Sequence, residues 1–291
     1  MPQKYCNKQI IKKMLSDLVS KNPCYVAIEK DKVIGYISGI SNIKELKASL
    51  TGVYVPEWAH SVKVNVDREK VYNALYKTIA KEWVRLGNFT HIISFYGNEH
   101  KLHNLFVEFG FGMLTIDGIK QVNKNNDIIS VDNLMIREMC EQDIYEVGLL
   151  HNELINHLLS SPIYLYLNNP KLSSDELKNK FMSKNIKTFV ALKNKEIISA
   201  IRVMLNNGPG CKTVIDKGTL GINFAYTKNK YRGCGVTPCL LREVLKWGSK
   251  HDMIRCVVDF ESQNRPATKF WLKHFKPVCK TFMRKVDDRV Q

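Results

Sequence analysis

The sequence predicts an α/β protein with a mixed (α+β) sheet, built as two tandem copies of one unit. The composition is that of a folded globular protein, since 44% of its 291 residues are hydrophobic and 25% are charged. The chain also resembles itself at a spacing of 164 to 165 residues. In each copy, strand-like apolar runs alternate with an amphipathic helical pattern. Two domains of ordinary size fit this length.

The repeat begins with a predicted β-hairpin in each copy. YVAIEKDKVIGYI, residues 25–37, aligns without a gap with FVALKNKEIISAI, residues 189–201. Further along, residues 74–96 align with residues 239–261, and both segments predict an amphipathic helix, a short turn and a strand. We therefore expect domains at residues 1–125 and 133–291, joined through the polar, Asn-rich residues 121–133.

Composition limits the classes of function. No apolar run approaches the about 18 residues of a membrane span, and the opening residues lack a signal-peptide pattern, so we expect a cytoplasmic protein without a membrane partner. The net charge of +16 suits a polyanionic partner, but its lysines are dispersed, which leaves nucleic acid possible and not favoured. The eight cysteines form no CxxC pair, and His100 and His103 lack a completing ligand pattern, so we expect no metal site. The sequence does not address the oligomeric state.

The most informative segment is the loop KYRGCGVTP at residues 230–238. An apolar run at residues 220–227 predicts a buried strand before it, and a helical pattern follows, with Thr237 as the expected N-cap and Pro238 at the first helical position. This order directs backbone N–H groups and the positive end of a helix dipole at one place, which suits a phosphate. On its own, the loop is equally compatible with a tight turn. The dinucleotide fingerprint and the ATP/GTP P-loop are excluded, because their third glycine and Gly-Lys-Ser/Thr are absent.

With its surroundings, the loop resembles the pyrophosphate loop of the GNAT superfamily of N-acetyltransferases. Arg232 and Gly235 match the family pattern Arg/Gln-x-x-Gly-x-Gly/Ala, while Thr237 replaces its last small residue. Residues 257–275 resemble the family's fifth strand and following helix, and residues 136–150 are similar to its first strand and helix. The recurring pattern of that later helix falls on Asn264, Ala267, Phe270 and Trp271. The resemblance covers the second copy and implies two tandem GNAT-like acyl-CoA N-acyltransferase folds.

The resemblance implies that strands four and five splay apart and that acetyl-CoA lies between them. A small-molecule or peptide amine would attack the thioester directly, and a backbone N–H near residues 224–226 would stabilise the oxyanion. The implied cofactor-binding residues are Ala225, Tyr226, Thr227, Arg232, Gly233, Cys234, Gly235, Val236, Thr237 and Asn264.

The catalytic assignments are Glu261, Tyr226 and Trp271. Trp271 stands where the family usually has a tyrosine acid, and an indole N–H can donate a hydrogen bond but does not titrate near neutral pH. Tyr226, Tyr231 or water could replace the acid. Glu261 is the expected base, because Asp259 and Glu261 share one face of strand five and Glu261 stands near the splay, although a salt bridge explains it equally well.

The acceptor remains open in the sequence. The loop at residues 160–170 borders the acceptor in the family, so Tyr164 and Tyr166 could line the site, with core packing expected for at least one of them.

The first copy looks degenerate. RGCGVT aligns with DREKVY, residues 67–72, so the glycines are lost, while Asp67 remains a good N-cap for the helix that follows. We expect this domain to be structural or to shape the substrate site. Two other functions stay open: a coenzyme A-binding sensor or interaction protein of this fold without turnover, and an RNA-binding protein that uses the basic surface.

Overall fold

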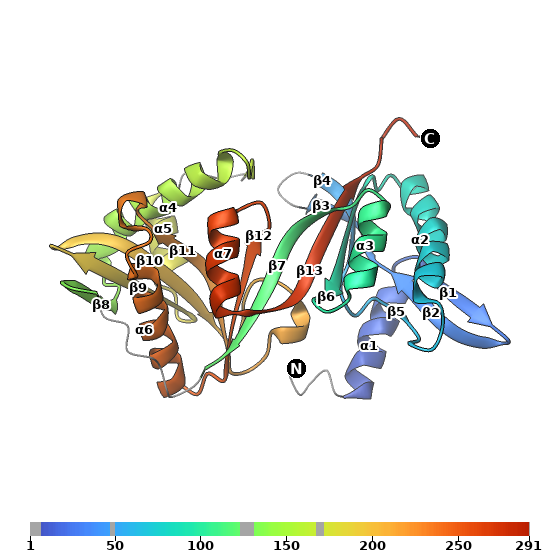
Figure 1. The fold of residues 1–291 in the computed structure, drawn as a ribbon, viewed down its shortest axis with the longest axis horizontal. Coiled ribbons are helices and arrows are strands. Elements are labelled where there is room, and N and C mark those ends of the chain that lie inside the picture. Colours follow the sequence, from blue (N-terminus) through green and yellow to red (C-terminus); the bar gives the residue numbers. More distant parts are fainter. Residues whose placement is uncertain (1–6, 47–49, 123–130, 167–171, 291) are drawn as a thin grey trace. The chain divides into compact units, whose positions relative to one another are not determined.

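The computed structural model describes residues 7–46, 50–122, 131–166 and 172–290. It shows a mixed α/β fold that divides into two compact units (Figure 1). Unit 1 contains the described residues up to Ile116, the segment Cys211–Thr213 and the residues from Pro277 onward. Unit 2 contains the described residues of Asp117–Gly210 and Val214–Lys276. The predicted α/β class is confirmed, whereas most of the predicted junction at residues 121–133 lies outside the described residues.

Unit 1 is built mainly from the first sequence copy. Its helices are α1 (Lys8–Val19), α2 (Arg68–Arg85) and α3 (His100–Glu108). Its strands are β1 (Cys24–Glu29), β2 (Lys32–Ser38), β3 (Ile40–Leu46), β4 (Leu50–Val55), β5 (His60–Val62), β6 (Thr90–Tyr96), the first half of β7 (Gly112–Gln121) and nearly all of β13 (Lys276–Lys285). The predicted hairpin is confirmed by the antiparallel pairing of β1 with β2, and the predicted helix and strand by α2 and β6.

The core of unit 1 forms where α2 packs on strands. Tyr72, Leu75, Ile79 and Trp83 recur at helical spacing and are buried, which is the pattern of one apolar helix face. Strand β6 is buried along almost its whole length, as expected for an interior strand with both faces covered. Asp67 caps α2 as predicted, because its side chain accepts a hydrogen bond from the Lys70 N–H at 3.1 Å.

The last strand of the chain belongs to the sheet of unit 1. Strand β13 pairs antiparallel with β6, from Cys279 opposite Tyr96 to Lys285 opposite Thr90 (Figure 1). On its other edge, β6 pairs in parallel with β4. Unit 1 therefore combines strands that are separated by most of the sequence.

Unit 2 follows the second copy. Its helices are α4 (Ile144–Leu159), α5 (Ser174–Phe181), α6 (Val236–Lys250) and α7 (Arg265–His274), with short 3₁₀ turns at Glu141–Asp143 and Asn229–Tyr231. Its strands are β8 (Leu134–Glu138), β9 (Ile186–Lys193), β10 (Glu196–Leu205), β11 (Thr219–Thr227), β12 (Arg255–Glu261) and the second half of β7. Strands β8 to β12 pair in sequence order, and only the pair of β11 with β12 is parallel.

A buried cluster of Val147, Leu150, Phe181, Phe224 and Tyr226 joins α4 and α5 to the sheet of unit 2. No helix within the described ranges has both the length and the apolarity needed to cross a membrane. A cytoplasmic location stays a prediction.

Candidate active site

Strands β11 and β12 separate partway along their length. Their parallel pairing runs from Thr219 opposite Arg255 to Ile222 opposite Val258, and no further pair joins them among the described residues. Strand β11 nevertheless continues to Thr227, paired on its other edge with β10. The last residues of β11 therefore keep one edge open toward a gap between the two strands.

A bulge marks the point of separation. The register of β10 and β11 shifts between Arg202 and Val203, which leaves Asn223 as an extra residue. Arg202 holds this residue, because its Nε donates to Asn223 Oδ1 at 2.8 Å and its Nη2 donates to the Asn223 carbonyl at 3.4 Å. Burial lowers the pKa of Arg202 to about 10, so the guanidinium remains charged at neutral pH. Arg202 thus fixes the bulge from which β11 leaves β12.

Backbone alternation decides which groups of β11 face the gap. The Tyr226 carbonyl accepts from Ser199 Oγ on β10 at 3.0 Å, and the Lys228 N–H donates to the Ile198 carbonyl at 2.9 Å. Residues 226 and 228 therefore direct their backbone groups toward β10. Since successive residues of a strand point these groups in opposite directions, those of Ala225 and Thr227 point toward the gap.

In the loop after β11, two glycines adopt the left-handed backbone conformation that glycine favours. Gly233 and Gly235 have φ angles of +78° and +80°, a region that strongly favours glycine. Helix α6 begins at Val236 with Gly235 as its N-cap, so the predicted N-cap, Thr237, was wrong. Gly235 offers no side chain to the helix, and no side-chain hydrogen bond caps this end. Backbone N–H groups of the first turn are thus left for an anion.

Thr237 instead ties the helix to the strand. Its hydroxyl lies 2.8 Å from Thr227 Oγ1, which lies 2.7 Å from Ser199 Oγ. Because Ser199 donates to the Tyr226 carbonyl, Thr227 must donate to Ser199, and Thr237 must donate to Thr227. This directed chain of hydroxyl groups holds the start of α6 against the end of β11.

Glu196 anchors the other side of the loop. Its carboxylate accepts from Lys228 Nζ at 2.9 Å, from the Tyr231 hydroxyl at 3.0 Å and from Lys230 Nζ at 3.2 Å. The hydrogen bond from Lys228, followed by that from Tyr231, lowers the pKa of Glu196 to about 2. Arg232 then turns back, and its Nε donates to the Thr227 carbonyl at 3.0 Å while its guanidinium lies over the Tyr226 ring.

These elements surround a cleft of about 480 Å³ in unit 2. Its lining combines the end of β11, the loop, the start of α6, the last turns of α4 and one face of α7. The lining residues are Leu154, His157, Ala225, Tyr226, Thr227, Arg232, Gly233, Thr237, Asn264, Pro266, Ala267, Lys269, Phe270, Trp271 and Lys273. Four of these residues are basic or histidine, and none of the described lining residues is a carboxylate.

His157 is the lining residue that the sequence did not indicate. Its Nε2 lies 3.3 Å from Asn264 Oδ1, and the same oxygen accepts from the Ala267 N–H as the N-cap of α7. That backbone bond identifies the atom as the amide oxygen, so His157 Nε2 must be the donor. In a neutral ring, Nδ1 then carries the lone pair and can accept a proton. No sequence pattern links His157 to Asn264, 107 residues away.

Tyr226 provides a protonated phenol beside the cleft. Burial raises the pKa of its hydroxyl, Arg232 opposes that rise, and Glu153 on α4 adds to it. The phenol therefore keeps its proton at neutral pH and can donate it.

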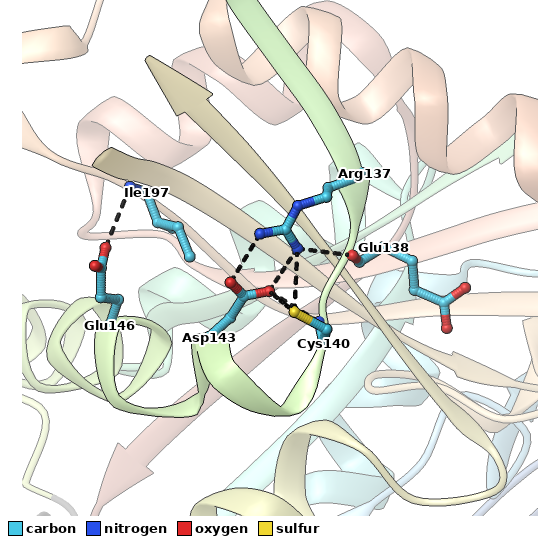
Figure 2. A network of polar contacts seen from close by, with 6 residues as sticks. All are labelled: Arg137, Glu138, Cys140, Asp143, Glu146 and Ile197. Carbon is cyan, nitrogen blue, oxygen red and sulfur yellow. Dashed lines mark hydrogen bonds and ion pairs between the residues drawn. The ribbon is translucent and has the colours of Figure 1, made fainter. Parts of the chain in front are cut away.

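Helix α4, which carries His157, is held at its start by a polar network (Figure 2). Arg137 on β8 donates to both carboxylate oxygens of Asp143, at 2.6 and 2.9 Å, and the Cys140 N–H donates to the same carboxylate at 2.8 Å. One turn later, Glu146 accepts from the Ile197 N–H of β10 at 3.2 Å. These bonds fasten α4 to both β8 and β10.

Most of the predicted site residues meet at the cleft. Ala225, Tyr226, Thr227, Arg232, Gly233, Thr237, Asn264 and Trp271 all line it. Cys234, Gly235 and Val236 complete the loop and the helix start without being lining residues. Glu261 is half-buried at the end of β12 and interacts with other groups of the protein. It is not among the described residues that line the cleft. Its role as a base stays a prediction.

Tyr164 and Tyr166 are 72% and 60% exposed, so the expectation that one of them packs in the core was wrong.

The splayed strands and the glycine loop at a helix N-terminus define the fold of an acyl-CoA N-acyltransferase. Residues 153–275 match the model of the acetyltransferase (GNAT) family. This match confirms the predicted resemblance to the GNAT acetyltransferases over this part of the chain.

Solved structures are similar over most of the chain. A GCN5-related N-acetyltransferase from Sphaerobacter thermophilus is 11% identical over 90% of this chain and 80% of its own, with a TM-score of 0.53. A functionally unknown conserved protein from Staphylococcus epidermidis is 10% identical over 90% of this chain and 94% of its own, with a TM-score of 0.50. A tandem GNAT protein from the clavulanic acid biosynthesis pathway is 9% identical over 91% of this chain and 82% of its own, with a TM-score of 0.47. No curated protein matches the chain.

Proposed function

We propose that unit 2 is an acetyl-CoA-dependent N-acetyltransferase that acts on a primary amine. One observation carries the proposal: the open edge of β11, the positive-φ glycine loop and the N-terminus of α6 all border one cleft. The cleft also presents Arg232, Lys269 and Lys273. Coenzyme A carries several phosphate charges, which this set of donors and cations fits. The family and fold support acyl-CoA-dependent N-acyl transfer in general terms.

The binding roles follow from position. We assign the pyrophosphate to the loop of residues 232–237, where uncapped N–H groups meet the positive end of the α6 dipole. Ala225 and Thr227 would bond the pantetheine amides along the open edge of β11. Bound acetyl-CoA supplies a thioester that is already activated toward attack by an amine.

The catalytic roles fall to three groups of this chain: two transfer protons and one stabilises the oxyanion. His157 Nδ1 would accept the proton of the attacking amine, while Asn264 holds the opposite ring nitrogen. The Ala225 N–H would donate to the thioester oxygen as negative charge develops there. Tyr226 would return a proton to the departing thiolate. We assign to Trp271 a packing role in the cleft wall, and we retain Glu261 as the competing base.

Binding is tested by thermal unfolding of the full chain with and without acetyl-CoA. At a hundred times the dissociation constant, the ligand should add about 2.7 kcal/mol of stability to the wild type. Arg232→Glu and Gly235→Val should lose this shift, while Lys184→Glu, an exposed change of the same charge away from the cleft, should keep it. If acetyl-CoA does not shift the wild type, the loop is only a turn, and salt-sensitive RNA retention becomes the next measurement.

Turnover is tested by thiol release from acetyl-CoA in the presence of a panel of primary amines. His157→Gln should lower kcat by about a hundredfold or more if His157 is the base, and Glu261→Gln should change it little. The reverse result would assign the base to Glu261. Tight binding without release for any amine would instead favour a coenzyme A sensor.

A further inference from the structure

Unit 1 contains a second cavity, independent of the cleft in unit 2. Its volume is about 770 Å³, and its lining residues come from the C-terminal half of α2 and from the end of β13 and the residues after it. Apolar side chains form much of its wall: Tyr76, Ala80, Val84, Phe89, Val286 and Val290. This volume falls within the range of about 300–1,000 Å³ that is usual for small-ligand sites.

Cations surround this apolar wall. Lys77, Lys81 and Arg85 follow one another every four residues along α2, and Arg284 comes from β13. Arg85 is paired with Glu82 at 2.6 Å. For the other three, no ion pair with a carboxylate is formed within the described part of the chain. The cavity thus has three positive charges without a counterion beside an apolar wall.

The second sequence copy shows that this imbalance is particular to unit 1. At the spacing of 165 residues, Lys77 and Lys81 correspond to Arg242 and Lys246. Both of those cations pair with Glu243, at 3.5 and 3.7 Å. The position of Glu243 is taken by Thr78 in the first copy, so the compensating carboxylate is missing there.

Arg284 is held in place by a chain of directed hydrogen bonds. His91 Nε2 lies 3.1 Å from the Asn88 carbonyl and must donate to it, so Nδ1 accepts from the Tyr76 hydroxyl at 3.0 Å. Burial lowers the pKa of His91 to about 4, which keeps the ring neutral. The Tyr76 oxygen then accepts from Arg284 Nη1 at 3.4 Å. This series of hydrogen bonds uses only one N–H of the Arg284 guanidinium, so its other N–H groups can donate to a ligand.

We propose that this cavity binds a free fatty acid, with its unbranched chain on the apolar wall and its carboxylate among Lys77, Lys81 and Arg284. A small polar anion would leave the apolar wall without a partner. A cationic amphiphile would meet three like charges. An anionic head on an apolar chain satisfies both parts of the cavity, because burial of the chain and charge-assisted hydrogen bonds then act together.

The test is the binding of a dansylated long-chain fatty acid to the full chain, followed by its displacement with unlabelled laurate. Laurate should compete, whereas acetate, which lacks the chain, and dodecyltrimethylammonium, which has the opposite charge, should not. Ala80→Trp, which fills the cavity, and Lys81→Glu, which reverses one charge, should each weaken binding at least about tenfold. Lys101→Glu, an exposed charge change on α3, is the matched control and should leave binding unchanged.

Equal competition by dodecyltrimethylammonium, or unchanged binding by Ala80→Trp and Lys81→Glu variants that remain folded by circular dichroism, would overturn the proposal. Cosedimentation with anionic lipid vesicles in the absence of laurate competition would also overturn it, in favour of a membrane surface. None of these measurements uses acetyl-CoA, so the outcome is independent of the function proposed for unit 2.

Discussion

The Arg68 guanidinium and the Glu99 carboxylate form a two-point ion pair in unit 1, with Nη1–Oε2 at 2.8 Å and Nη2–Oε1 at 2.9 Å. At the spacing of 165 residues, these two positions correspond to Gly233 and Asn264, which both line the cleft of unit 2. Helix α2 also begins at Arg68, three positions before the counterpart of Val236, where α6 begins. In unit 1, the first turn of α2 and the Arg68–Glu99 ion pair therefore occupy the positions that form the open glycine loop before α6 and the N-cap of α7 in unit 2.

Glu99→Gln should destabilise unit 1 by about 1–2 kcal/mol, because it breaks a two-point, charge-assisted contact between side chains that are only 28% and 26% exposed. Chemical denaturation, followed by the fluorescence of the tryptophans, measures this. Glu82→Gln, which breaks the more exposed pair with Arg85, is the control and should have little effect. Equal losses for the two variants would contradict a structural role of the Arg68–Glu99 pair.

Glu196→Gln should weaken acetyl-CoA binding while leaving the fold intact, because Glu196 holds the loop through Lys228, Lys230 and Tyr231. Titration calorimetry should show a dissociation constant raised by about three- to tenfold, as the loop becomes more costly to order. Lys228→Met should have a similar effect, since it removes the principal partner of the same carboxylate. Unchanged affinity in both variants would show that the loop is ordered without this anchor.

Asp143→Asn should make the free energy of unfolding less dependent on pH in the acidic range. Arg137 is the main cause of the lowered pKa of Asp143, which falls from 3.8 to about 2. A lowered pKa stabilises the fold above the ordinary value, and that contribution is lost as the pH falls from about 4 toward 2. The variant should therefore lose about 2 kcal/mol at pH 7 and differ little from the wild type near pH 2. Parallel curves of unfolding free energy against pH would contradict this.

Gly235→Ala should destabilise unit 2 by about 1–2 kcal/mol, because its φ of +80° is unfavourable for a residue with a Cβ. The added Cβ would also lie 3.1 Å from Val131 Cγ2. Gly112→Ala is the control: its Cβ would meet nothing within 4 Å, and its φ is not positive, so stability should stay the same or rise. Thermal unfolding compares the two variants directly.

Local patterns predicted the strand at residues 220–227, which is β11 (Thr219–Thr227) in the structure, the loop after it and the amphipathic helix after the loop, because each depends on neighbouring residues. The exact start of α6 was harder to predict from the sequence. Thr237 followed by Pro238 is a good N-cap signal, but a glycine in the left-handed region two residues earlier also starts a helix, and the hydroxyl of Thr237 bonds to Thr227 instead.

Contacts between distant residues could not be predicted. His157 becomes part of the cleft only because α4 is fastened to β8 and β10, and nothing near it in the sequence marks an imidazole that faces Asn264. The predicted domain at residues 133–291 likewise includes the strand at residues 276–285. The hydrogen bond of 2.7 Å between Ser94 and Thr281 hydroxyl groups shows the opposite, since these residues are 187 positions apart and lie in one unit.

The pairing of β13 with β6 sets the order in which the protein can be completed on the ribosome. Residues 90–96 emerge well before their partner strand at residues 279–285 is translated. Until then, one edge of β6 has no partner, and such an edge invites pairing with other chains. The sheet of unit 1 thus depends on residues 279–285, and termination of synthesis before them would leave this sheet incomplete.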